Sequence, residues 1–111
     1  MSARRYTVVW TAVALADIER LAAYLVDESP LRAETILERI ISRAESLDRL
    51  PERGRTPPEL RSIGDQTWRE LQDRPWRILY RIAAPDRVEI HGVIDGRRSL
   101  TDVLLERILR S

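Results

Sequence analysis

Hydrophobic residues along the chain change their spacing several times, and each spacing predicts a different element. Residues 5–11, RYTVVWT, are rich in β-branched and aromatic side chains, which favours a strand. Thr11 is suited to cap a helix that follows it. Apolar residues then recur at helical steps of four, three and four, at Ala14, Ile18, Leu21 and Leu25. This helix is predicted to end near residues 27–30, DESP.

A second helical pattern follows directly. Ser29 and Pro30 resemble a helix cap with proline at the first helical position, so the pattern predicts a helix that begins there and ends by Pro51. Its apolar stripe consists of Ala33, Ile36, Leu37, Ile40, Ala44 and Leu47. The short connection predicts two antiparallel helices joined by a tight turn.

Residues 50–66 hold three prolines and two glycines and predict one long loop. Three strand-like segments come next, separated by the short turns DRP and APD: residues 67–72, 76–83 and 87–94. Such short separators predict an antiparallel meander.

The last segment, residues 99–110, has a possible cap at Ser99 or Thr101 and a helical pattern of Val103, Leu104 and Ile108. The predicted order is β-α-α-β-β-β-α in one domain that spans residues 1–111. This is an α+β fold in which an N-terminal helical hairpin packs on one face of a small antiparallel sheet, with a short C-terminal helix.

The strand at residues 76–83 alternates apolar side chains with arginines. Because alternate residues of a strand point to opposite faces, the helical hairpin is expected to cover the face that carries Trp76, Ile78, Tyr80 and Ile82. Arg77 and Arg81 are then expected to project from the other face, toward solvent or a partner. An antiparallel sheet tolerates one solvated face, so the two arginines can also be ordinary surface residues.

Composition restricts the chemistry. The formal net charge is +1, and all 19 cations are arginine, so no lysine can act as a base or form a Schiff base. The chain has no cysteine, which excludes disulfides, thiolate metal sites and a thiol nucleophile. No apolar run approaches the length of a membrane span. We therefore expect a cytoplasmic protein that binds no membrane.

The sequence predicts neither a cofactor nor a metal site. There is one histidine, His91, which excludes a histidine metal cluster, and the glycine patterns of nucleotide-binding loops are missing. On a strand His91 is expected to share a face with Glu89 and Val93. It is either a half-buried structural residue or a group that transfers protons.

Arginines are the remaining candidate site. Convergent arginines bind phosphate groups or an acidic peptide by charge-assisted hydrogen bonds, and chance placement in an arginine-rich chain is the competing explanation. In the predicted meander, Arg69, Arg77 and Arg98 converge near one end of the open sheet face. The full set of candidate phosphate-binding or partner-binding residues is Arg55, Arg69, Arg77, Arg81, Arg97 and Arg98.

The opening strand, the helical hairpin and the motifs LPERGR, WRELQDRPWRILYRI and VIDGRRSL together resemble the RelE/ParE superfamily of toxins from type II toxin–antitoxin modules. The resemblance covers nearly the whole chain. Its most specific parts are the aromatic-Arg-x-x-Tyr pattern in PWRILYR and the Gly-Arg-Arg that follows the last strand. The resemblance implies the same fold as the periodicities.

It also implies one of two activities. RelE-like members are ribosome-dependent endoribonucleases that cleave messenger RNA, whereas ParE-like members bind and inhibit DNA gyrase. By position, Arg69, Arg77 and Arg98 match the basic residues of the ribonuclease group and would be catalytic if the chain were a ribonuclease. A toxin homologue that has lost its activity is a third possibility.

Departures from the ribonuclease pattern favour the ParE-like alternative. The lysine expected soon after Arg69 is missing, because residues 70–72 are Glu, Leu and Gln. The tyrosine expected in the C-terminal segment is missing, and Leu104 is nearest to its position. Asp95 stands where many relatives carry a histidine just before the Gly-Arg pair. Arginine stabilises charge but is a poor general base. We therefore leave the enzymatic status open and expect a gyrase-binding inhibitor rather than a messenger RNA endoribonuclease.

The resemblance also implies partners. We expect a cognate antitoxin with a small, acidic and amphipathic C-terminal segment that lies along the helical hairpin and the sheet edge, and forms a hetero-oligomer with the toxin. The target is DNA gyrase or, alternatively, the ribosome and its messenger RNA.

Overall fold

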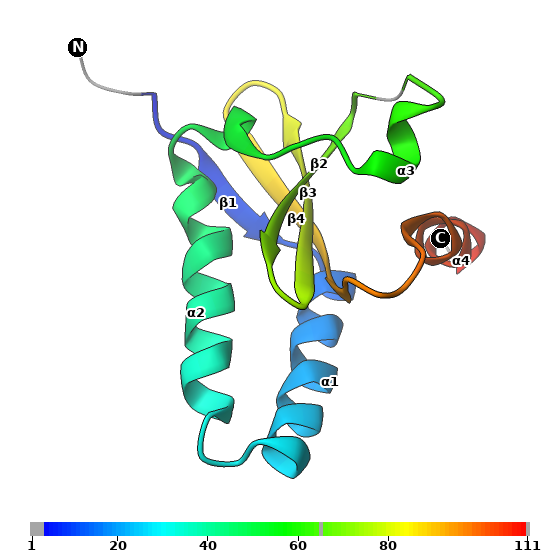
Figure 1. Cartoon of the computed structure of the whole chain (residues 1–111). Helices are drawn as coiled ribbons and strands as arrows, with labels where there is room; N and C mark the ends of the chain where they lie inside the picture. The colour runs from blue at the N-terminus through cyan, green and yellow to red at the C-terminus, as the bar shows by residue number, and fades with distance from the viewer. Residues whose placement is uncertain (1–3, 65, 111) are drawn as a thin grey trace.

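The computed structural model describes residues 4–64 and 66–110, with side chains as far as residue 105. Figure 1 shows an open sheet with helices on both of its faces. No helix in the described part of the chain is long and apolar enough to cross a membrane. In chain order the elements are β1 (Thr7–Trp10), α1 (Ala12–Glu28), α2 (Ala33–Glu45), the 3-10 helices η1 (Ser46–Asp48) and η2 (Pro51–Arg53), α3 (Pro58–Arg61), β2 (Trp68–Asp73), β3 (Trp76–Ala83), β4 (Arg87–Asp95) and α4 (Leu100–Arg110).

The sheet has the strand order β1-β4-β3-β2. Strands β2, β3 and β4 form the predicted antiparallel meander. Strand β1 pairs with β4 in parallel, so the sheet is mixed rather than wholly antiparallel as predicted. The chain reaches β4 only after α1, α2, β2 and β3, which gives the long connection that a parallel pair requires. The α+β class and the order of the elements are confirmed.

Helices α1 and α2 cover one face of the sheet, which we call the hairpin face (Figure 1). The main core lies here and joins both helices to the buried side chains of β3 and β4, among them Ile78, Tyr80, Val88 and Ile90. Trp76 and Ile82 pack against its margin. The predicted orientation of strand β3 is therefore confirmed.

The predicted start of the second helix is wrong by three residues. The backbone N–H of Ser29 donates to the carbonyl of Leu25, so Ser29 ends α1 instead of capping α2. Residues 29–32 then form a turn closed by a hydrogen bond from the Arg32 N–H to the Ser29 carbonyl, with Pro30 at its second position. Proline is favoured at that position of a turn, and α2 begins at Ala33.

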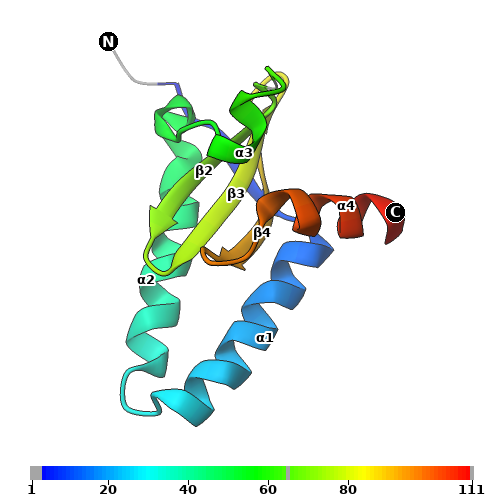
Figure 2. The same ribbon diagram turned by 45° about the vertical axis from the view of Figure 1, so that its right-hand side comes forward.

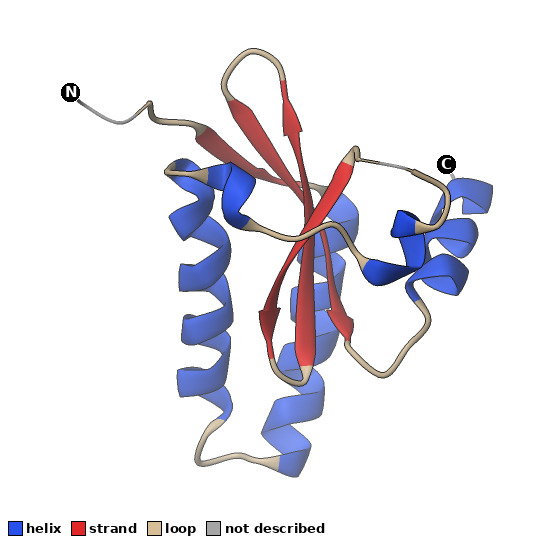
Figure 3. Cartoon of the chain, turned by 45° about the horizontal axis from the view of Figure 1, so that its top comes forward, coloured by secondary structure: helices blue, strands red, loops and turns tan. Residues whose placement is uncertain are grey.

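The opposite face of the sheet is only partly open. Helices α3 and α4 lie on this face, away from the α1–α2 hairpin (Figures 2 and 3). They bury a second apolar cluster that consists of Leu60, Leu79, Ile94, Leu100 and Val103, with Trp68 and Leu104 at its margin. The predicted loop at residues 50–66 thus contains η2 and α3. The side chain of Ile108, which was predicted to join the α4 stripe, lies outside the described residues.

A β-bulge shifts the register of β3 and β4. Leu79 pairs with Gly92, but Tyr80 pairs with Ile90, so His91 is the extra residue. The bulge reverses the alternation after His91: Val93 enters the main core on the hairpin face, whereas His91 remains with Glu89 on the opposite face. The prediction that His91 and Val93 share a face is therefore wrong.

Beyond the bulge, β4 continues past the end of β1. The last paired residues of these strands are Trp10 and Ile90. The buried carboxylate of Asp17, on α1, accepts a hydrogen bond of 2.9 Å from the Val93 N–H. Asp17 thus satisfies a backbone donor that β1 does not reach, and it ties α1 to the end of the sheet.

Candidate functional site

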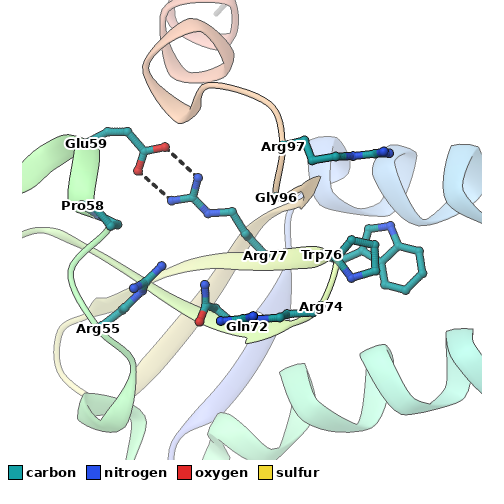
Figure 4. A pocket seen from close by; sticks show the side chains of 10 residues that line it. Arg55, Pro58, Glu59, Gln72, Arg74, Trp76, Arg77, Gly96 and Arg97 are labelled. Atoms are coloured by element: carbon teal, nitrogen blue, oxygen red, sulfur yellow. Dashed lines mark hydrogen bonds and ion pairs between the residues drawn. The ribbon is translucent and has the colours of Figure 1, made fainter.

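Arg77 lies at the centre of a chain of ion pairs on the α3–α4 side of the sheet. Glu59, on α3, accepts hydrogen bonds of 2.7 and 2.8 Å from the Arg77 Nη1 and Nη2 atoms, and Figure 4 shows this two-pronged contact. The Nε atom of Arg77 donates to Glu70 at 2.7 Å, and Arg55 donates to the second oxygen of Glu70 at 2.8 Å. Arg77 and Glu70 are 7% and 2% exposed, so the expectation that Arg77 projects into solvent or toward a partner is wrong.

Glu59 also joins α3 to α4. Its Oε2 atom accepts a hydrogen bond of 3.2 Å from the backbone N–H of Leu100, in the first turn of α4. The hydrogen bonds from Arg77 lower the pKa of Glu59 to about 2, against the opposing effect of burial. The same contact with Glu59 raises the pKa of Arg77. The arginine therefore acts as a structural tie between the sheet, α3 and α4.

Arg69 lies on the other face of the sheet. It is paired with Tyr80 in the β2–β3 register, so its side chain emerges on the hairpin face. There it donates to the carbonyls of Glu52 and Gly54, both at 2.9 Å. The Tyr80 hydroxyl donates to the Pro51 carbonyl and accepts from the Gly54 N–H at 2.9 Å. Arg69 and Tyr80 together hold residues 51–54 against the sheet, and the predicted convergence of Arg69 with Arg77 does not occur.

Arg81 and His91 both lie on the face of the sheet opposite the hairpin face, in the part that α3 and α4 leave open. Glu89 accepts a hydrogen bond of 2.7 Å from Arg81, and His91 Nε2 lies 3.0 Å from the same oxygen. These contacts lower the pKa of Glu89 to about 2, and the hydrogen bond with His91 has the largest effect. Arg81 also lies over the Trp68 ring, and His91 meets that ring edge to face. His91 is therefore a partly buried member of a surface cluster, as the structural alternative predicted.

Arg97 and Arg98 follow β4, where the chain turns toward α4. Arg97 donates to both oxygens of Asp95, and these hydrogen bonds lower the pKa of Asp95 to about 2. The backbone N–H of Arg98 donates to the Asp95 carbonyl at 3.0 Å. The carboxylate and the carbonyl of Asp95 thus both accept hydrogen bonds from the next residues of its own turn.

A hollow of about 420 Å³ lies beside this turn. Figure 4 shows its rim, with Arg55, Gln72 and Arg74 along one side and Arg97 near Trp76 on the other. It also borders Pro58, Glu59, Pro75, Arg77 and Gly96. The structure thus brings Arg55, Arg77 and Arg97 to one hollow, whereas Arg69 and Arg81 lie elsewhere. Within the described residues, no group of three or more histidine, cysteine or acidic side chains is arranged to hold a metal ion.

Sequence reasoning missed the two acidic residues that organise this region. Glu70 lies between Arg69 and the buried Leu71 on a predicted strand. Because alternate residues of a strand point to opposite faces, the sequence could have placed Glu70 on the face opposite Leu71. Glu59 lies in the PPEL segment of a loop, where no periodicity distinguishes it from a solvated residue.

Comparison with known proteins places the chain in a family. The family model for the ParE toxin of the type II toxin–antitoxin system parDE matches residues 8–100. The chain is similar to Toxin RelE2 of Caulobacter vibrioides, with 46% identity over 48 residues, which cover 43% of this chain and 54% of that protein. The match thus spans about half the length of this curated relative.

Two solved structures have a similar fold. The first is the chromosomal ParDE toxin–antitoxin system from P. aeruginosa, with a TM-score of 0.67 and 19% identity over 84% of this chain and 98% of that one. The second is the toxin–antitoxin complex RelBE2 from Mycobacterium tuberculosis, with a TM-score of 0.58 and 26% identity over 82% of this chain and 91% of that one. Since the family model matches most of the chain, the protein belongs to the ParE toxin family of type II toxin–antitoxin systems, within the RelE/ParE superfamily.

Proposed function

We propose that this toxin arrests growth by binding DNA gyrase, that it cuts no RNA, and that a cognate antitoxin neutralises it in the cytoplasm. Membership of the ParE family supports gyrase as the target. The observation that carries the argument against cleavage is the position of Arg77: its guanidinium is buried and held by the carboxylates of Glu59 and Glu70.

Cleavage of RNA through the 2′-hydroxyl needs one group that takes a proton and another that returns one, as well as a cation that stabilises the phosphorane. Arg77, the cation at the matching position, already has two anionic partners, and Arg69 is bound to loop carbonyls on the opposite face. Asp95 has a pKa of about 2 and is a weak base at neutral pH. This arrangement favours inhibition by binding over catalysis.

A messenger RNA endoribonuclease remains the second candidate because Arg55, Arg77 and Arg97 border one hollow. The two activities differ in their products. We expect the purified protein to inhibit gyrase supercoiling and to leave translated messenger RNA intact in primer extension. Codon-phased breaks that disappear in the Arg97→Ala and Arg98→Ala variants, with supercoiling unaffected, would refute the proposal.

The antitoxin can be tested separately. The neighbouring reading frame is expected to encode a small acidic protein that restores growth and co-purifies with the toxin. Normal growth of cells that express this chain alone would count against toxin activity of either kind.

A further inference from the structure

Leu50 has a backbone conformation that leucine rarely adopts. Its φ and ψ angles are 49° and 53°, in the left-handed region, and it is the one non-glycine residue with a positive φ in the described part of the chain. The Cβ atom makes this conformation costly for an L-residue. The proline that follows, Pro51, further disfavours helical angles at the residue before it. Glycine or asparagine would adopt the same backbone at a lower cost.

The side chain of Leu50 gains little from the fold in return. It is 70% exposed and lies outside both apolar clusters described above. The next residue, Pro51, is buried, so the chain has to turn at this point to place the proline inside. The fold thus explains the turn, but it does not explain why a leucine occupies it.

The contacts around Leu50 hold it rigidly in place. Arg53 donates from its Nη1 atom to the carbonyls of Arg49 and Leu50, at 2.6 and 3.2 Å. On the other side, the Tyr80 hydroxyl and the remaining contacts of residues 51–54 tie the loop to the sheet. Strained backbone persists where its surroundings over-determine it, and such positions cluster at binding sites. The exposed leucine is therefore presented on a firm support.

Exposed arginines lie beside this leucine. The side chain of Arg49 is exposed and makes no hydrogen bond or ion pair within the described residues. Arg5 lies opposite Arg49 in an isolated antiparallel bridge, and its side chain remains 64% exposed although it pairs with Asp48. The surface around Leu50 thus offers guanidinium donors, whose planar geometry suits carboxylate oxygens.

We infer that Leu50 contacts the protein target of the toxin, by entering an apolar pocket that has an acidic rim. Arg5 and Arg49 would then meet carboxylates on that rim. Because the loop is already fixed, it loses little conformational entropy on binding. In the proposed function the target is DNA gyrase, so the inference rests on that part of the proposal and deepens it by naming the loop that touches the target.

Two other occupants fit less well. A nucleic acid strand favours a strong excess of positive charge, whereas the exposed Glu52 and the partly exposed Asp48 lie among these arginines. A second copy would bring the same loop against itself in a two-fold pair. Arg49 would then face Arg49 of the other copy, and the like charges would repel.

Gyrase supercoiling assays on single variants test the loop. Leu50→Asn tolerates the left-handed backbone but removes the apolar side chain, so we expect the concentration for half-maximal inhibition to rise about tenfold or more. Arg49→Ala should raise it about threefold, and Leu50→Met, which stays apolar, less than about threefold. The matched controls are Leu31→Asn, at a residue 98% exposed in the α1–α2 turn, and Arg32→Ala, at the opposite end of α2; both should inhibit within about twofold of the unmodified chain.

Thermal melts distinguish this role from a structural one. Because asparagine relieves the backbone strain, Leu50→Asn should lose inhibition without a lower melting temperature. If the melting temperature of this variant fell by about 5 °C or more, Leu50 would stabilise the fold itself and the inference would be overturned.

The outcomes separate this inference from the proposed function. If the unmodified chain inhibits gyrase and Leu50→Asn inhibits equally well, the target docks elsewhere and only the inference is overturned. If the unmodified chain does not inhibit gyrase, the proposed target fails and the inference fails with it.

Two binding measurements test the other partners. The protein encoded by the neighbouring reading frame, titrated calorimetrically, should bind Leu50→Asn within about twofold of the unmodified chain. A loss of that binding as large as the loss of inhibition would overturn the inference. A mobility shift with a short DNA duplex that is weakened in Arg49→Ala, with gyrase inhibition intact, would also overturn it.

Cross-linking gives a readout that does not depend on affinity. The chain contains no cysteine, so a single introduced cysteine can carry a photoreactive maleimide. A label at Glu52→Cys, two residues from Leu50, should cross-link to gyrase, while the same label at Thr35→Cys, exposed in the first turn of α2, should not. Equal yields at both positions, or cross-links only between copies of this chain, would overturn the inference.

Discussion

The contact between Glu59 and Arg77 gives the sharpest prediction for stability. The Glu59→Gln substitution keeps the shape of the side chain. It removes the negative charge of the carboxylate that accepts hydrogen bonds from both terminal nitrogens of Arg77. The fold lowers the pKa of Glu59 from 4.5 to about 2. A shift of this size corresponds to roughly 3 kcal/mol of stability at neutral pH, because one pKa unit equals about 1.4 kcal/mol.

The sign of the pH dependence follows from the same shift. Because the folded state lowers this pKa, the stabilising contribution is complete above the unfolded value of 4.5 and is lost as the pH falls toward 2. Glu59→Gln should therefore lower the free energy of unfolding by about 3 kcal/mol at pH 7, and by only about half of that at pH 3. Glu89 and Asp95 also have pKa values of about 2, but their ionisation affects the variant and the unmodified protein equally.

Urea denaturation followed by circular dichroism at pH 7, 5 and 3 measures this difference. Glu38→Gln, an exposed glutamate on the outer face of α2, is the matched control and should change stability by less than about 0.5 kcal/mol. The reasoning is refuted if Glu59→Gln is no less stable than the control at pH 7, or if the difference between them does not shrink at pH 3.

Three further predictions concern the contacts that position the loop and the sheet. Gly54→Ala should destabilise the fold by about 2 kcal/mol or more in thermal melts, because its Cβ would lie 2.1 Å from the Tyr80 hydroxyl oxygen; an unchanged melting temperature would exclude that close contact. Asp17→Ala should cost about 2 kcal/mol and speed hydrogen exchange of the Val93 amide, which loses its buried acceptor; continued protection of that amide would contradict the assignment. Tyr80→Ala should cost about 3–5 kcal/mol in chemical denaturation, whereas Arg81→Ala should cost less than about 1 kcal/mol, since only Tyr80 is fully buried; equal losses would refute the strand orientation.

The sequence predicted the elements wherever apolar spacing controls them. The helical stripes of residues 14–25 and 33–47 and the alternation of strand β3 each bury a continuous surface, so the period of the pattern reveals the element. The turn at residues 29–32 was misassigned because Ser-Pro is equally suited to begin a helix and to occupy a turn. The bulge at His91 was missed because an extra residue in a strand leaves composition unchanged and alters only the pairing.

The candidate site was harder to predict because its contacts connect distant residues. Glu59 and Arg77 are 18 positions apart, and α3, which carries Glu59, has only four residues. No periodicity can show which carboxylate will meet Arg77, since that depends on how the chain returns to the sheet. The arginines were therefore identified as candidates, but their partners were not.

These partners change what the arginines of strand β3 can do. An arginine on a strand beside a predicted open face suggests a phosphate contact, yet Arg77 is enclosed by two carboxylates and Arg81 is held by Glu89 beside Trp68. Among the described residues, the ion-pair partners of the Glu70 carboxylate are Arg55 and Arg77. Release of Arg77 toward a substrate would therefore leave Glu70, which is 2% exposed, paired with Arg55 alone within that part of the chain, in a low-dielectric environment. Such a loss opposes recruitment of Arg77 for catalysis. The side chains of Arg20 and Arg97 are 68% and 79% exposed and carry no comparable cost, so contact with a partner protein is expected there rather than on strand β3.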